Sequence, residues 1–390
     1  INRIAIVRIT SKMFDNPWAR FKKGYLEYGE VIEEVFVDLT RVFEFDPNEA
    51  ENTLFKRVPP DVRAAFHVMN YQKFYKVTIE RQRLAKAFLS ASGMNDLITY
   101  IMTSIYTSAS YDEFLTMQYM LGRNILNGRL FPVEIPAVQK ANMTDIVSTV
   151  KGISNLIEFP ERKYNPAHVF QHTDKSNQYL IINAKFDAEM DVNVLASAFN
   201  MDKAQFMGQR VLVDSFGSLD SDRLAELFAD DPNYVPITDA EKEALDALPL
   251  CLVDENFWMI YDNLNEFREV ENGQGLYWNY FYHQWKTFST SPYSNAVLFV
   301  PETPAITAVE VTPQTATVSA GSSLALTTVV TSAGYAPQEV TYESNSDDVT
   351  ITEGGVVQVA QDASAGSVTI TVTSVFDPSV SDTATITVQA

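Results

Sequence analysis

The sequence changes character abruptly at Pro301-Glu302-Thr303-Pro304. All four Trp, all eleven Met, the single Cys and every Lys, Arg and His lie before this point, whereas residues 302–390 contain ten acidic and no basic side chains. A shift of this size is typical of a domain boundary, and 390 residues exceed the usual size of one hydrophobic core. We therefore expect a body over residues 1–301 and a separate C-terminal domain over residues 302–390.

The C-terminal part is predicted to be all β. Thr and Val alternate with small or apolar residues in seven or eight short runs, a period that places alternate side chains inward and outward. Turn residues separate the runs, as at Thr312-Pro313, Gly354-Gly355 and Asp377-Pro378. This pattern predicts a β-sandwich.

The first ninety residues favour extended structure. Residues 1–20 are expected to form an arm, because Pro17 argues against a helix. Residues 21–83 contain charged, strand-like runs at 31–39 and 74–79, with turn signals at Asp46-Pro47 and Pro59-Pro60. Such a segment is more typical of a long protruding hairpin than of a compact core.

The longest helical pattern follows at residues 94–126. Apolar side chains recur there at three- and four-residue spacing without a proline, and a single helix of this length would span about 50 Å. The alternative is a break at residues 108–110, because Ser110 and Glu113 have the spacing of a capping box.

Residues 129–301 alternate between strand and helix patterns, which predicts an α+β domain. The aromatic run at residues 276–285 could be a platform for stacking bases or sugars. Because aromatic side chains fall on both faces of this strand, we favour a central strand that is covered on both sides.

No motif in the chain assigns catalysis, and we expect neither an enzyme nor a cofactor. His168 and His172 are spaced as helical metal ligands, with Glu158 or Glu161 as a third, but Pro166 argues against a helix through the pair. We therefore favour packing or surface roles and predict no metal site. The lone Cys251 lies in an apolar run, where a thiol is inert.

The net charge and the hydropathy of the chain limit the kinds of partner that it can bind. A formal net charge of -21 repels phosphate, so contact with DNA should be loose and non-specific. No apolar run has the length needed to cross a bilayer, so no membrane partner is expected.

Several blocks of the body resemble the major capsid proteins of small protein-primed podoviruses of the Bacillus phage phi-twenty-nine group. They are collinear over most of residues 20–300 and include Phe21-Lys22-Lys23-Gly24, Asp191-Val192-Asn193-Val194-Leu195-Ala196 and Gly275-Leu276-Tyr277-Trp278-Asn279-Tyr280. Residues 302–390 resemble a bacterial Ig-like group 2 domain, with Tyr342 in place of the usual tryptophan.

The resemblance implies the α+β capsid fold of tailed phages and herpesviruses (the Hong Kong phage type). Its parts would be an N-terminal arm (1–20), an extended loop (21–83), and peripheral and axial domains with a spine helix (84–301). An insertion at 218–250 is expected on the rim of the axial domain, followed by the Ig-like domain (302–390).

The function so implied is that of a virion structural protein. It would self-assemble in the host bacterial cytoplasm as hexamers and pentamers into an icosahedral or prolate shell around double-stranded DNA. Its further partners would be a scaffolding protein and a portal or connector. The alternative is a bacterial surface or secreted adhesin, or a carbohydrate-binding protein, with an Ig-like module.

The charge layout suggests where subunits meet. We hypothesise that the acidic stretch at residues 30–46 contacts basic residues of an adjacent subunit, because overlapping loops supply contact area at modest cost. The candidate interface residues are Lys22, Lys23, Glu33, Glu34, Asp38, Arg41, Arg81 and Arg83.

Overall fold

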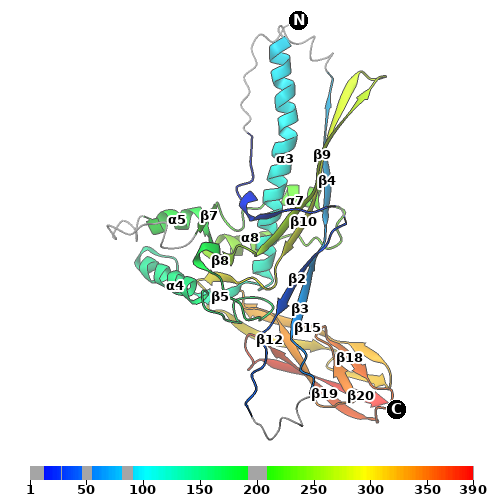
Figure 1. Ribbon diagram of the computed structural model, residues 1–390. Helices are drawn as coiled ribbons and strands as arrows, with labels where there is room; N and C mark the ends of the chain where they lie inside the picture. Colours follow the sequence, from blue (N-terminus) through cyan, green and yellow to red (C-terminus); the bar gives the residue numbers. More distant parts are fainter. Residues whose placement is uncertain (1–12, 28, 46–54, 81–90, 192–208, 390) are drawn as a thin grey trace.

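The computed structural model describes residues 13–27, 29–45, 55–80, 91–191 and 209–389. A long helix and a long strand hairpin extend from one end of the body, and a looped strand pair and the C-terminal domain extend from the other (Figure 1). Helices and strands mix throughout the body, as the predicted α+β class requires. No helix among the described residues is both long and apolar enough to span a membrane.

Helix α3 (Ala91–Leu126) is the spine of the body. It runs without a break, so the single-helix prediction is confirmed and the alternative break at residues 108–110 is wrong. At 36 residues it is about 54 Å long. The helix ends at Leu126. Gly128, two residues further on, has a positive φ of 64°, the left-handed conformation that commonly terminates helices.

A four-stranded sheet lies along the helix in the order β1-β9-β10-β4. Its strands are β1 (Lys22–Tyr25), β9 (Trp258–Asn272), β10 (Tyr277–Thr290) and β4 (Tyr71–Ile79). The β9–β10 hairpin closes through a turn at residues 273–276, where the sequence predicted a turn rather than a phosphate-binding loop.

The aromatic strand β10 is an interior strand, since it pairs with both β9 and β4. Trp278, Tyr280 and Tyr282, on one of its faces, pack toward Ile98 and Ile105 of α3. The described residues provide no such cover on the opposite face, so the expectation of cover on both faces is not met within them.

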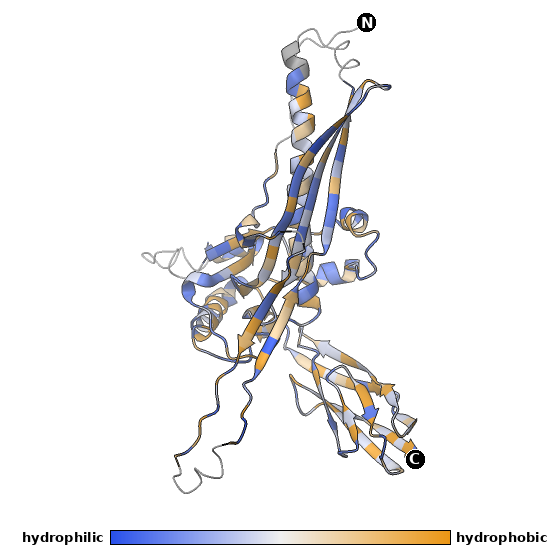
Figure 2. Ribbon diagram, turned by 45° about the vertical axis from the view of Figure 1, so that its right-hand side comes forward, coloured by the Kyte–Doolittle hydropathy of each residue, from blue (hydrophilic) through white to orange (hydrophobic). Residues whose placement is uncertain are grey.

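The segment after β1 forms a separate two-stranded ladder. Strand β2 (Ile32–Val37) pairs antiparallel with β3 (Val62–His67), and residues 38–61 connect them. The sequence predicted one hairpin over residues 21–83, but β1 and β4 pair with β9 and β10 instead. Figure 2 shows the ladder and its loop projecting beside the C-terminal domain.

The end of the predicted arm belongs to the core. Trp18 is fully buried and precedes a short 3-10 helix, Ala19–Phe21. Phe21 stacks on Trp258 with ring centroids 4.4 Å apart. The boundary expected at residue 20 therefore falls inside the packed body.

A five-stranded sheet in the order β5-β11-β8-β6-β7 forms the second half of the body. Two of its three interior strands, β11 and β8, are buried at every residue, which gives largely apolar runs rather than alternation. Helices α4 (Met143–Leu156) and α5 (Ala184–Met190) belong to this half, as do short 3-10 helices at Lys140–Asn142 and Lys175–Asn177. The strands are β5 (Phe131–Glu134), β6 (Gln178–Asn183), β7 (Gln209–Val213), β8 (Leu250–Asp254) and β11 (Ala296–Val300).

The predicted insertion contains two short helices, α7 (Ser221–Leu227) and α8 (Asp239–Asp246). It packs on the spine helix, and its place on the rim of the axial domain stays a prediction. Gly122 of α3 leaves room for the insertion's Ile237 and Leu245, whose side chains lie 3.3 and 3.4 Å from where a Cβ would stand. Apolar side chains of the insertion thus complete the main core of the body.

The C-terminal domain contains nine strands and a hydrophobic core of its own, as the composition break predicted. Its central sheet has the order β13-β20-β19-β16, with β12-β15 and β14-β18-β17 as smaller sheets. The strands are β12 (Ala305–Thr312), β13 (Thr315–Ser319), β14 (Ser323–Ala325), β15 (Thr327–Ala333), β16 (Val340–Ser344), β17 (Val349–Ile351), β18 (Val356–Val359), β19 (Gly366–Ser374) and β20 (Ser381–Gln389).

Candidate assembly surfaces

A buried charge cluster fixes the sheet to the spine helix. Lys286 of β10 is fully buried and hydrogen-bonds to both Glu113 of α3 and Asp262 of β9. Lys22 completes the cluster, with its Nζ 2.6 Å from Asp262 and 3.2 Å from Glu113. Burial alone would lower the pKa of Lys22, but the two carboxylates outweigh it and the pKa is raised. Two cations and two anions therefore balance inside the subunit.

The base of the β2–β3 ladder is held by a chain of polar contacts. Glu34 Oε1 accepts a hydrogen bond from Ser291 Oγ at 2.7 Å, and its Oε2 lies 3.2 Å from His67 Nε2. The other ring nitrogen of His67 lies 2.7 Å from Ser289 Oγ. Because His67 is only 2% exposed, we assign this set of contacts a structural role rather than a catalytic one.

A second set of contacts holds the ladder to the body at Asp38, directly after the end of β2. Arg162 Nη1 is 2.7 Å from Asp38 Oδ2, and Arg63 donates a hydrogen bond of 2.6 Å to the Ala167 carbonyl. The hydrogen bond from Arg162 lowers the pKa of Asp38 below its ordinary value. Residues 39–45 and 55–60 beyond this point contain no regular secondary structure, and the contacts of Glu34 and Asp38 fix the ladder at its base.

The predicted interface residues separate into three groups. Lys22, Glu34 and Asp38 make the contacts above within the subunit, and Lys23 donates to the Glu255 carbonyl and the Asn256 side chain. The side chains of Glu33 and Arg41 are exposed and form no ion pair with any described residue. Arg81 and Arg83, the remaining two, lie outside the described residues.

The loop that joins β2 and β3 carries a surface that sequence reasoning missed. Val42 is 95% exposed, Phe45 94% and Phe55 89%. Large apolar side chains this exposed are costly to leave in water and typically mark an interaction surface. The signal was present as the apolar run Val42-Phe43-Glu44-Phe45 inside a segment with turn residues at both ends.

The uncovered face of the four-stranded sheet is the second such surface. Phe74 of β4 is 58% exposed and lies 5.5 Å from the ring of His283 on β10. Lys76 lies over the Phe281 ring at 5.5 Å. This face presents aromatic rings with a cation beside them, and no described residue of the chain covers Phe74.

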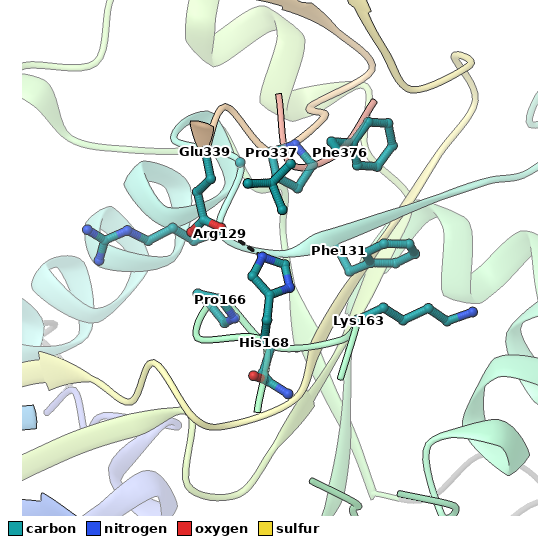
Figure 3. A pocket seen from close by; sticks show the side chains of 11 residues that line it. Arg129, Phe131, Lys163, Pro166, His168, Pro337, Glu339 and Phe376 are labelled. Carbon is teal, nitrogen blue, oxygen red and sulfur yellow. Dashed lines mark hydrogen bonds and ion pairs between the residues drawn. The ribbon is translucent and has the colours of Figure 1, made fainter. Parts of the chain in front are cut away.

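The C-terminal domain docks on the body through residues 334–339. Tyr335 packs against the main core of the body, and Phe376 lies 6.3 Å from Phe131. His168 Nε2 lies 2.8 Å from Glu339 Oε2, and this pair borders a cavity of about 450 Å³ between the two domains (Figure 3). The hydrogen bond to Glu339 raises the pKa of His168. The domain is therefore seated on its own subunit by apolar and charged contacts together.

The two candidate metal ligands are not brought together on a helix. Residues 166–173 form no helix, and His168 is paired with Glu339. No group of three possible metal ligands occurs among the described residues. Cys251 is fully buried on β8, and burial raises the pKa of its thiol far above the ordinary value.

Comparison with known proteins shows which family has this sequence and architecture. A family model described as "Phi29-like phage major capsid protein" matches residues 1–300. The major capsid protein of Bacillus phage GA-1 is 36% identical over 339 residues, which cover 85% of this chain and 66% of that protein. The major capsid protein of Bacillus phage B103 is 33% identical over 368 residues, which cover 92% and 76%. The chain thus spans just under two thirds of the GA-1 protein.

Solved structures show the same fold at lower identity. A chain in the capsid structure of Staphylococcus phage Andhra has a TM-score of 0.59 at 14% identity, covering 77% of this chain and 87% of that one. A chain from the head fibre and inner core structure of bacteriophage P68 has a TM-score of 0.58 at 14% identity, with coverages of 77% and 88%.

The spine helix, the long sheet beside it and the looped strand pair define a tailed-phage capsid subunit of the Hong Kong phage type. The chain belongs to the Phi29-like phage major capsid protein family. It is a structural protein of the phage head, not an enzyme, and the adhesin alternative is not favoured. The assignment of residues 302–390 to the Ig-like group 2 stays a prediction.

Proposed function

We propose that this chain self-assembles as hexamers and pentamers into the icosahedral or prolate shell that encloses a double-stranded DNA genome. Family membership supports the function as a capsid protein. The exposed apolar loop between β2 and β3 is the observation that supports assembly through contacts between copies. Val42, Phe45 and Phe55 have no cover within the described residues, and a second copy would supply it.

The loop is suited to span two subunits because its base is rigid. The ties from Glu34 and Asp38 fix its direction, so the tip is presented without a large ordering cost. In this proposal the loop between β2 and β3 bridges subunits, whereas Trp18, β1 and β4 pack within the subunit and form the wall together with residues 84–301. The Ig-like domain (302–390) stays on the subunit that carries it.

In this proposal, charged side chains determine how neighbouring copies align with one another. Glu33 and Arg41 are the candidates whose charges are free among the described residues, and Arg81 and Arg83 remain candidates from the sequence alone. Lys22, Lys23, Glu34 and Asp38 support the interface indirectly, because their charged groups are used within the subunit.

The further partners in the proposal are a scaffolding protein, a portal or connector, and the packaged DNA. The net charge of -21 supports a loose, non-specific contact with DNA, because an acidic inner wall lets the genome slide during packaging.

Charge reversal at two neighbouring positions tests the interface. Glu33→Lys should abolish or strongly reduce shell formation while the subunit unfolds at the same urea concentration as the unmodified chain. Glu34→Lys should destabilise the subunit itself, because it removes the acceptor of Ser291 and His67. Glu243→Lys, at an exposed position of α8, makes the same change in net charge and should assemble normally.

The readout is the yield of shells in a sucrose gradient after co-expression with the scaffolding protein. Normal shells from Glu33→Lys would show that this face is not an interface. Equal loss of shells from all three variants would mean that net charge alone controls assembly.

A further inference from the structure

The C-terminal domain has no cation of its own. Its ten acidic side chains lie in a segment without Lys, Arg or His, so any ion pair that they form within the subunit must use a cation of the body. Glu339 finds one in His168, with 2.8 Å between Oε2 and Nε2. The pair joins two parts of the chain that are 171 residues apart.

Both sides of this contact are built in advance of docking. His168 has a φ of 51°, in the left-handed region, and its turn is closed by two hydrogen bonds of 2.8 Å between Asn165 and Val169. On the other domain, Gly334 and Tyr335 have φ values of 59° and 60°. His168 thus enters the ion pair from a strained backbone position, and the second turn lies four residues before Glu339.

Packing beside the pair is close but incomplete. A Cβ at Gly128 would stand 3.0 Å from the Ala336 carbonyl oxygen and from Pro337 Cα, so the backbones of the two domains touch there. The cavity of about 450 Å³ next to this contact is walled by Phe131, Phe376 and other side chains. Figure 3 shows His168 reaching across it toward Glu339. The ion pair therefore bridges a gap that apolar packing leaves open.

Permanent cations and two acids surround His168. Arg129 and Lys163 line the same cavity, Arg162 donates to the His168 carbonyl at 3.4 Å, and Arg63 donates to the neighbouring Ala167 carbonyl. The charges of Arg162 and Arg63 are partly balanced by Asp38 and Asp61, which lie 2.7 and 3.5 Å from them. Loss of the imidazole proton removes the cationic partner of Glu339, and the permanent cations that line the cavity keep the contact from becoming repulsive.

We propose that His168 and Glu339 form a pH-sensitive latch, which holds the C-terminal domain against the body when His168 is protonated and loosens it when His168 is neutral. Histidine suits this role because its proton is exchanged near neutral pH.

The direction of the pH effect follows from linkage. Glu339 raises the pKa of docked His168 above its ordinary value, so docking binds a proton more tightly than the separated state does. The contribution of the latch is fully present below the ordinary pKa of about 6.5 and is lost as the pH rises through the raised value. Both side chains are partly exposed, so we expect about a two- to fivefold change in the docking equilibrium.

Hydrogen exchange of the full chain measures this equilibrium. The amides of residues 334–339 and 128–131 report docking, and those of β19 and β20 in the domain core are the internal reference. Rates measured at about pH 6 and about pH 8.5 are corrected for the intrinsic pH dependence of exchange. The variants are His168→Asn, which tolerates the left-handed backbone, and Glu339→Gln, which keeps the shape of the side chain.

In the unmodified chain, protection of the docking amides should fall two- to fivefold from the lower to the higher pH, while the reference amides stay protected. Both variants should show the lower protection at both pH values. Equal protection at the two pH values in the unmodified chain would overturn the proposal, as would an unchanged pH response in His168→Asn. Loss of protection in the reference amides identifies misfolding, and Glu339→Gln then provides the independent test.

Discussion

Replacement of Lys286 by Met provides a quantitative test of the charge cluster that joins β9, β10 and α3. Met matches the length of the Lys side chain and removes only its charge. The Lys286 side chain is 0% exposed and that of Glu113 is 5% exposed, so the substitution leaves a carboxylate buried without its main partner. Breaking a buried ion pair from one side costs about 3–5 kcal/mol, because the remaining charge stays desolvated.

The assay is urea unfolding of the unassembled subunit, followed by tryptophan fluorescence. All four Trp lie in the body and none in the C-terminal domain, so the signal isolates the unfolding of the body. For a slope of about 3 kcal/mol per molar urea, the expected loss lowers the midpoint by on the order of 1 M.

Two further variants separate charge from packing. Lys22→Met removes a cation whose side chain is 23% exposed, so water screens the loss and the cost should be about 1 kcal/mol. Glu113→Gln added to Lys286→Met restores charge balance and should recover most of the lost stability. If Lys286→Met shifts the midpoint no more than Lys22→Met, or if Glu113→Gln gives no recovery, the cluster does not stabilise the body as we describe.

Three other predictions have defined outcomes. Gly128→Ala should destabilise the protein by about 1–2 kcal/mol, because Gly128 has a positive φ and contacts the C-terminal domain. Gly152→Ala, at an open position of α4, should instead stabilise it by about 0.5–1 kcal/mol. Thermal unfolding compares the two variants, and equal effects would refute the contact at Gly128. Arg223→Gln should destabilise the body by about 3 kcal/mol, because Arg223 binds the buried carboxylate of Asp112 through two nitrogens; a loss below about 1 kcal/mol in urea would contradict this. Because the pKa of Asp38 is depressed, the ion pair of Asp38 with Arg162 is fully formed above the ordinary aspartate pKa of about 4 and is lost as the pH falls through the depressed value. An NMR titration in which Arg162→Gln leaves the pKa of Asp38 unchanged would disprove the pairing.

The elements with strong local signals could be predicted from the sequence. The helix over residues 94–126 follows from a long apolar period without proline, and the composition break at residues 301–304 locates the C-terminal domain.

Pairing between distant segments could not be predicted in the same way. The period of a strand shows which faces are apolar but not which partner it has, so β4 was assigned to a hairpin with the 31–39 run instead of to β10. Strand β8 was missed because Leu250–Asp254 is buried on both faces and shows no alternation. The contact of the insertion with the spine helix was not predicted either, because the contact of Arg223 with Asp112 spans 111 residues of sequence.

The candidate interface illustrates the same limit for charges. A single sequence shows which residues are charged but not which charges are used within the subunit. Lys22 and Glu34 resemble Glu33 and Arg41 in the sequence, and only their neighbours in space distinguish them. The exposed phenylalanines of the loop were a clearer signal, since apolar side chains between turn residues seldom stay uncovered.

Electron microscopy of the chain after co-expression with a scaffolding protein tests the central claim most directly. The account predicts closed shells built from hexamers and pentamers, in which the loop at residues 38–61 lies on a neighbouring copy. A soluble monomer that forms no shells, or shells in which this loop contacts only its own subunit, would contradict it.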